Sequence, residues 1–132
     1  MSQADPRLGL RVIHRRYVSY ADAHYGGNLV DGAYVLRLFG EAATEACIRT
    51  DGDEGLLASY ERVAFHAPVR AGDVLEVEAT VTRVGTRSRD LDLVARAVGR
   101  ARPDRGPSAS EVMDPAVVVV TATATVVVSR HE

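Results

Sequence analysis

The spacing of hydrophobic positions changes along the chain, and the change predicts one long helix followed by several strands. Residues 29–48 are rich in leucine, alanine, glutamate and arginine and contain no proline, a composition typical of a helix. Their apolar side chains form two stripes that cover most of the helix circumference. Such a helix is expected at the centre of a fold rather than on its surface. The polar residues 50–55 predict the turn that ends it.

Strands are predicted on both sides of this helix. Two segments after it, residues 75–82 and 91–97, alternate apolar and polar side chains, which is the pattern of a strand with one buried face. The last segment is rich in valine and threonine and alternates least, so we expect it inside the sheet, after a long loop at residues 99–115. The predicted strands cover residues 9–18, 56–67, 75–82, 91–97 and 116–128.

One apolar helix and one antiparallel sheet bury their apolar faces most economically when the sheet curls around the helix. This arrangement is the hotdog fold, and its class is α+β. We therefore expect residues 1–132 to form a single hotdog domain, with an antiparallel sheet wrapped around one long central helix.

Composition narrows the class of protein. The chain has 132 residues, of which 46% are hydrophobic, and this is enough for a core. The apolar stretch at residues 116–128 is too short to cross a bilayer as a helix, and residues 1–10 lack the pattern of a signal peptide. Cys47 is the single cysteine, and the four histidines show no ligand spacing. We expect a cytoplasmic protein without a membrane partner, a metal or a resident cofactor.

Charge is distributed unevenly. The formal net charge is −2, but residues 83–105 hold seven arginines and three aspartates, so this segment carries +4 and the remainder −6. Nucleic-acid binding needs a broad basic face, which this pattern does not predict. A localised basic segment suits a ligand with one anionic end, such as a phosphorylated cofactor. The alternative is a solvent-exposed hairpin that happens to be rich in arginine.

Two segments carry a resemblance to known families. Residues 65–73, FHAPVRAGD, resemble the F-x-x-P-V-x-x-G-D stretch of hotdog acyl-CoA thioesterases and dehydratases. Residues 19–33, SYADAHYGGNLVDGA, closely resemble a stretch of the 3-aminobutyryl-CoA ammonia lyases, a hotdog family that also includes β-alanyl-CoA ammonia lyases. The resemblance extends over residues 11–128. Thioesterases of this fold usually carry an Asp-Glu pair on the helix, where this chain has Gly40 and Glu41.

The resemblance implies a carbon–nitrogen lyase. Its reaction would be the reversible elimination of ammonia from a 3-aminoacyl-CoA, such as 3-aminobutyryl-CoA, to give a 2-enoyl-CoA such as crotonyl-CoA. Coenzyme A would then enter only as part of the substrate. Two alternatives are an acyl-CoA thioesterase and a non-catalytic hotdog protein that binds acyl-CoA.

Elimination needs a base for the proton next to the thioester carbonyl. Asp31 is a catalytic candidate because the resemblance places it beside the reacting group, although an aspartate at a helix start is also a common N-cap. Glu41 is the second candidate, since burial on an apolar helix would tune it as a base. Its alternative role is a pair with Arg37.

Asp31 and Glu41 are ten residues apart, about 15 Å along one helix. We therefore expect them to meet only across two subunits, which makes a homodimer the smallest unit, with a hexamer as a larger alternative.

The remaining candidates lie around the helix start and on a hairpin. His24 could orient a carboxylate or move a proton near neutral pH, although a loop histidine often has no role. Tyr25 could hydrogen-bond the thioester or only pack against it. The backbone N–H groups of Gly32 and Ala33 are candidates for the enolate oxygen, and the alternative for Gly32 is close packing. For the CoA phosphates the candidates are Arg87, Ser88 and Arg89, followed by Arg102 and Arg105.

Overall fold

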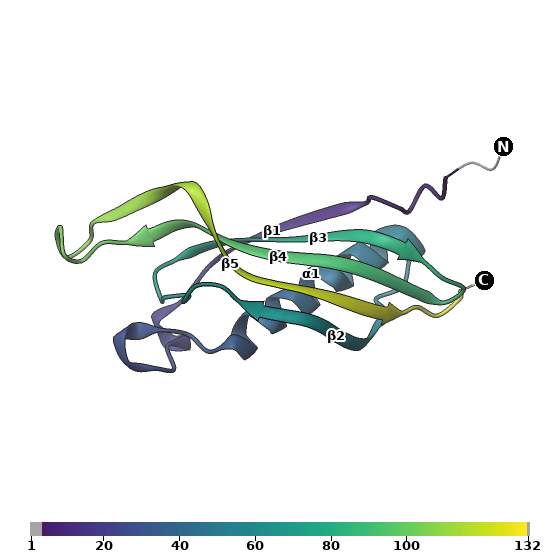
Figure 1. The fold of residues 1–132 in the computed structure, drawn as a ribbon, viewed down its shortest axis with the longest axis horizontal. Coiled ribbons are helices and arrows are strands. Elements are labelled where there is room, and N and C mark those ends of the chain that lie inside the picture. The colour runs from purple at the N-terminus through teal and green to yellow at the C-terminus, as the bar shows by residue number, and fades with distance from the viewer. Residues whose placement is uncertain (1–3, 132) are drawn as a thin grey trace.

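A five-stranded antiparallel sheet curves around one long helix in the computed structural model, which describes residues 4–131 (Figure 1). The strand order is β1-β3-β4-β5-β2, so β1 and β2 are the two edges. This arrangement confirms the predicted α+β hotdog class. The elements are β1 (Arg11–Tyr17), the 3₁₀ turns η1 (Tyr20–Asp22) and η2 (Gly26–Asn28), α1 (Gly32–Asp51), β2 (Leu56–Phe65), β3 (Val74–Val84), β4 (Ser88–Ala101) and β5 (Ser110–Val127).

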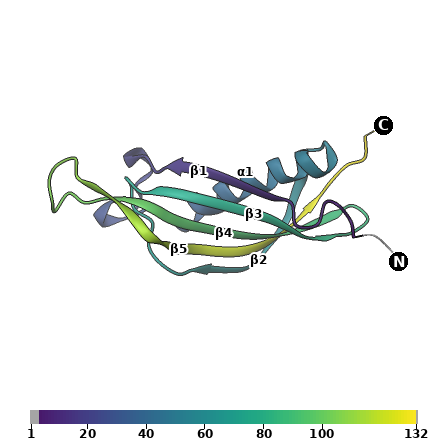
Figure 2. The ribbon, with the colours of Figure 1, turned by 90° about the horizontal axis from the view of Figure 1, so that it is seen from above.

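The core lies between α1 and one face of the sheet (Figures 1 and 2). Phe39 on the helix is fully buried, as are Leu75 and Leu91 on the facing strands. Burial of each such side chain contributes roughly 1.5–3 kcal/mol. The other face of the sheet is polar, as the alternation in β3 and β4 predicted. Among residues 4–131 no helix, α1 included, is long and apolar enough to cross a membrane.

The helix begins and ends three residues later than the sequence predicted. It begins after Asp31, whose carboxylate accepts a hydrogen bond from the Tyr34 backbone N–H at 3.1 Å. Val30 instead pairs with the segment that follows β2 in the sequence, because its N–H donates to the Val69 carbonyl at 2.9 Å. The helix ends at Gly52, whose left-handed φ of 63° terminates it at low cost.

The prediction of a long loop at residues 99–115 is wrong. β4 extends to Ala101 and β5 begins at Ser110, and the two strands form a hairpin that projects beyond the sheet (Figure 1). Arg102 and Arg105 stabilise this arm through Glu111, with N–O distances of 2.7 and 3.2 Å. These ion pairs link the turn between the two strands to the start of β5. β5 pairs with β4 on one side and β2 on the other, as expected of an interior strand.

Candidate active site

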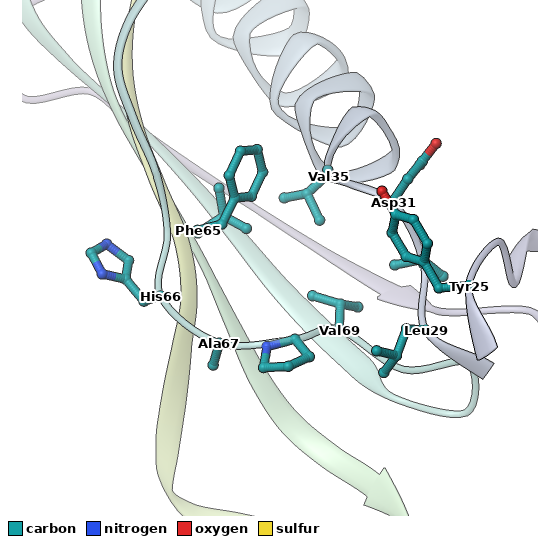
Figure 3. A pocket seen from close by; sticks show the side chains of 12 residues that line it. Tyr25, Leu29, Asp31, Val35, Phe65, His66, Ala67 and Val69 are labelled. Carbon is teal, nitrogen blue, oxygen red and sulfur yellow. The ribbon is translucent and has the colours of Figure 1, made fainter. Parts of the chain in front are cut away.

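A cavity of about 440 Å³ opens beside the first turn of α1 (Figure 3). The segment that follows β2 forms one wall and the loop before α1 forms the other, and most of the side chains are apolar. Asp31 supplies the single carboxylate among the described lining residues. The lining comprises Tyr25, Leu29, Val30, Asp31, Gly32, Val35, Phe65, His66, Ala67, Pro68, Val69 and Val120.

Asp31 is half-buried at the N-terminal end of α1. One carboxylate oxygen accepts the Tyr34 N–H, so the N-cap role is confirmed. No residue between 4 and 131 donates a hydrogen bond to the other oxygen. The positive end of the helix dipole favours its negative charge. Asp31 can therefore cap the helix with one oxygen and still present the second to a ligand.

The first N–H groups of a helix have no acceptor within it. Within residues 4–131, the N–H groups of Gly32 and Ala33 donate to no other backbone or side-chain oxygen. Gly32 lines the cavity, whereas the Ala33 side chain is exposed outside it. Both N–H groups are thus free to donate to an oxygen of a bound molecule.

Close packing also requires the glycine at position 32. A Cβ atom there would lie 2.6 Å from two ring carbons of Phe65. The Phe65 ring, 57% exposed, turns toward Val35 and forms a wall of the cavity (Figure 3). Gly32 is therefore required for close packing against Phe65. This packing leaves the backbone N–H of Gly32 available to a bound molecule.

The F-x-x-P-V-x-x-G-D segment holds the loop that leads to Asp31. Asp73 at its end is completely buried and accepts two hydrogen bonds of 2.9 Å from the Arg100 guanidinium. This ion pair fixes the segment against the arm of β4. Val69 in the same segment accepts the N–H of Val30, immediately before Asp31. The motif has a structural role here and positions the candidate carboxylate.

Tyr25 lines the cavity, and His24 lies beside Tyr25 rather than in the lining. The two rings meet edge to face with their centroids 4.7 Å apart. The His24 side chain is exposed, and its backbone N–H donates to the Leu29 carbonyl at 2.8 Å. The catalytic role of His24 and the thioester contact of Tyr25 stay predictions.

Glu41 does not line this cavity in the same chain, as its separation from Asp31 along the helix predicted, and its catalytic role across two subunits stays a prediction. Its side chain is 47% exposed and pairs with Arg16 on β1 at 2.8 Å. It borders a separate hollow between α1 and β1, with Leu38 and Val77. The expected burial is therefore wrong, and the alternative partner Arg37 is wrong as well. Glu41 is a surface ion-pair residue in this structure.

Helix geometry explains where Glu41 points. Gly40 faces β2, because a Cβ atom there would lie 3.5 Å from the Tyr60 hydroxyl. Glu41 is rotated from it by about 100° and turns toward the opposite edge strand, β1. The meeting of Asp31 and Glu41 across two subunits stays a prediction.

The hairpin candidates separate into two groups. Arg89 is 3% exposed, and its guanidinium binds both oxygens of Asp51, at 2.9 and 2.7 Å, and the carbonyls of Gly85 and Ser88. All its nitrogens are thus used within the fold, and the prediction that it binds a phosphate is wrong. The Ser88 hydroxyl accepts a hydrogen bond from Arg83. Arg87 is exposed.

Sequence reasoning did not identify His66 as a site candidate. The residue follows the end of β2, is exposed and lines the cavity entrance, and its Nε2 lies 2.7 Å from the Thr121 hydroxyl. Its ring points away from the apolar side chains (Figure 3). Its place between a strand end and Pro68 is the signal that could have found it. No three His, Cys, Asp or Glu side chains within residues 4–131 are placed to hold a metal ion.

Fold and sequence comparisons define the class. Residues 27–102 match the thioesterase superfamily. A hexameric hotdog fold thioesterase of Campylobacter jejuni has a similar fold, with a TM-score of 0.72 at 19% identity over 96% of this chain and 84% of that one. The molecule is therefore a hotdog protein of the thioesterase superfamily.

Two relatives are more similar. A 3-aminobutyryl-CoA ammonia lyase of Acetoanaerobium sticklandii is 50% identical over 87% of this chain and 91% of its own length. The structure of β-alanyl-CoA:ammonia lyase from Clostridium propionicum matches with a TM-score of 0.87 and 32% identity, over 93% of this chain and 87% of that one. The chain belongs to this family of CoA-thioester ammonia lyases.

Proposed function

We propose that the chain is a carbon–nitrogen lyase that reversibly eliminates ammonia from a short 3-aminoacyl-CoA, such as 3-aminobutyryl-CoA, to give a 2-enoyl-CoA such as crotonyl-CoA. The observation that carries the proposal is the position of Asp31. One of its oxygens is free beside two helix N–H groups, at an apolar cavity. The family membership supports the same reaction.

The proposed reaction uses these groups as follows. The thioester oxygen accepts hydrogen bonds from the N–H groups of Gly32 and Ala33, which stabilise the enolate that forms. The free oxygen of Asp31 takes a proton from the carbon next to the carbonyl. The bond from the β-carbon to the ammonium nitrogen breaks, its electron pair leaves with nitrogen as ammonia, and a C=C bond forms. The proton on Asp31 then passes to water, and the reverse sequence adds ammonia.

A thioesterase is the second candidate, because the superfamily carries that name. Hydrolysis needs a group that activates water at the thioester. The helix position facing Tyr60 is Gly40, which offers no carboxylate, and Glu41 turns to the other side. This difference favours the lyase.

The proposed active unit is a homodimer joined along β2. Among residues 4–131 β2 pairs with β5 alone, so its other edge presents backbone groups without a strand partner there. Apolar side chains along it are exposed, including Leu56 at 76% and Phe65 at 57%. A second copy would cover both features and complete the wall of the cavity. The hexamer and the cytoplasmic location stay predictions.

The test is to mix purified protein with crotonyl-CoA and ammonium and follow two signals. Loss of the enoyl-thioester absorbance without release of free thiol is the expected result. Thiol release would establish hydrolysis instead. If neither signal changes while crotonyl-CoA still binds, the protein is a non-catalytic acyl-CoA binder.

A further inference from the structure

The cavity beside Asp31 has two kinds of wall. Its outer wall consists of the rings of Tyr25 and Phe65, which are each 57% exposed and can turn toward solvent. Its inner wall is buried and consists of valines from the loop before α1, from α1 itself, from the segment after β2 and from β5. These valines are Val30, Val35, Val69 and Val120.

The inner wall has a fixed shape at Val35. Valine is branched at Cβ, and one rotamer accounts for most of its conformations in a helix. The Val35 side chain is 1% exposed and belongs to the hydrophobic core between α1 and the sheet. Because this core is closely packed, the side chain has no space into which it could withdraw. A bound molecule must therefore fit against Val35 as it stands.

Val35 lies next to the groups that are proposed to react. It follows Asp31 by four residues and Gly32 by three, so the three residues share one face of the first turn. Cα–Cβ bonds of a helix tilt toward its N-terminus, which brings the Val35 methyl groups level with that turn. Figure 3 shows the Val35 side chain between Asp31 and the Phe65 ring.

We propose that Val35 limits the length of the acyl chain. The cavity accepts the β-carbon of the substrate and one further carbon, and it rejects longer chains. Val35 is thus a specificity-determining residue, which contacts the substrate and takes no part in proton transfer. The inference rests on the proposed function, because that function places the reacting carbon beside Asp31 and Gly32.

The space in front of Val35 follows from helix geometry. Side chains three or four residues apart have Cβ atoms about 5–6 Å apart. A substrate carbon must stay about 3.5–4.0 Å from a Val35 methyl group. About 2 Å remain, and each C–C bond advances an extended chain by roughly 1.3 Å. One or two carbons beyond the reacting carbon therefore fit.

The volume of the cavity is compatible with this limit. Its space of about 440 Å³ extends to the exposed rings of Tyr25 and Phe65, and the thioester and the start of the pantetheine arm must share it. Phe65 reaches the same region, since its ring packs against Gly32, but the exposed ring can turn aside. A movable wall sets no sharp length limit, whereas the buried Val35 does.

The experiment compares ammonia addition to acryloyl-CoA, crotonyl-CoA and trans-2-hexenoyl-CoA, in order of increasing acyl length. The wild type should use 2-hexenoyl-CoA about 100-fold less efficiently than crotonyl-CoA, measured as kcat/KM. Val35→Ala should raise the ratio of kcat/KM for 2-hexenoyl-CoA over crotonyl-CoA by about tenfold. Val35→Ile, which extends the side chain, should lower the ratio for crotonyl-CoA over acryloyl-CoA by about tenfold.

Val81→Ala is the matched control. It removes the same atoms from a buried valine on β3 that lies outside the cavity lining, and both ratios should stay at the wild-type values. A ratio of two substrates does not depend on the fraction of protein that is folded, so a loss of stability in any variant leaves the comparison intact.

Unchanged ratios in both Val35 variants would overturn the inference and leave the lyase intact. A wild type that uses 2-hexenoyl-CoA as efficiently as crotonyl-CoA would do the same. An equal shift in Val81→Ala would assign the effect to a loosened core and contradict a contact between Val35 and the substrate.

If the wild type adds ammonia to none of the three thioesters, the proposed function fails, and binding then tests the length limit separately. Calorimetry compares the saturated thioesters butyryl-CoA and hexanoyl-CoA. A wild-type preference for butyryl-CoA that Val35→Ala reduces by about tenfold supports the limit. Equal affinities in the wild type, no binding of either thioester, or a preference that Val35→Ala retains would contradict it.

Discussion

The two ends of α1 each carry an aspartate, and the two carboxylates have opposite surroundings. Asp31 has one backbone partner, and its free oxygen faces a cavity. Asp51 is bound by Arg89 and Arg7, and these hydrogen bonds lower its pKa to about 2, with Arg89 the largest cause. Aspartate therefore has a proposed catalytic role at the start of α1 and a structural role at its end.

The difference distinguishes carboxylates that can take part in catalysis from carboxylates that only stabilise the fold. A carboxylate whose oxygens are both used by guanidinium groups cannot accept a proton from a substrate near neutral pH. A carboxylate with a free oxygen at a cavity can. Arg87 and Arg89 show the same contrast, because the exposed arginine is available and the buried one is not.

The largest expected effect is on catalysis at Asp31. Asparagine at position 31 keeps the N-cap but cannot take a proton, so Asp31→Asn should lower kcat/KM for ammonia addition by about 10³-fold. The melting temperature should stay close to that of the wild type. Asp51→Asn is the matched control at the other end of the helix, and its activity per folded molecule should be unaffected. A fully active Asp31→Asn enzyme would remove Asp31 from the mechanism.

The next effect is on stability at the opposite end. Arg89→Ala leaves Asp51 without its buried partner and should lower the free energy of unfolding by about 3 kcal/mol. Denaturant unfolding measures the change. Arg83→Ala, which breaks the exposed pair with Asp90, is the comparison and should cost less than about 1 kcal/mol. Equal losses in both variants would contradict a special role for the buried pair.

A pH dependence follows from the lowered pKa of Asp51. Because this pKa is lower in the folded state than in the unfolded chain, the stabilisation is complete above about pH 4 and is lost as pH falls toward 2. The free energy of unfolding of the wild type should therefore fall more steeply over this range than that of Asp51→Asn. Parallel curves would show that Asp51 is not the group responsible.

A smaller effect is expected at Gly32. The Cβ atom of Gly32→Ala would meet the Phe65 ring, and displacement of this cavity wall should lower kcat/KM by about tenfold. Phe65 is partly exposed and can move, so stability should change little. The second substitution Phe65→Leu should restore part of the loss, and additive losses in the double variant would exclude the clash as the cause.

The smallest effect is expected at Glu41. Because its pair with Arg16 is exposed, Glu41→Gln should change stability by less than about 1 kcal/mol and turnover by less than about threefold. A loss of turnover near that of Asp31→Asn would instead support a catalytic role of Glu41 across two subunits.

Local patterns predicted the helix, the strands and the hotdog class, because alternation and apolar stripes report burial directly. The arm of β4 and β5 was missed because contacts between the turn and the strands stabilise it, such as the Arg102–Glu111 ion pair, which joins residues nine apart. Asp31 could be predicted because a helix start is visible in sequence. The exposure of Glu41 could not be predicted, because it depends on an ion pair with Arg16, which lies 25 residues earlier on β1. The partners of Arg89 are equally distant, and Asp51 lies 38 residues earlier.

The most direct test of the account is solvent deuterium exchange at the carbon next to the thioester carbonyl. 3-Aminobutyryl-CoA is incubated with enzyme in D₂O, and the deuterium at this carbon is followed by mass spectrometry. The account predicts that the wild type introduces deuterium there as elimination and addition cycle, and that folded Asp31→Asn does so about 10³-fold more slowly. Exchange at the wild-type rate in Asp31→Asn would contradict the central claim.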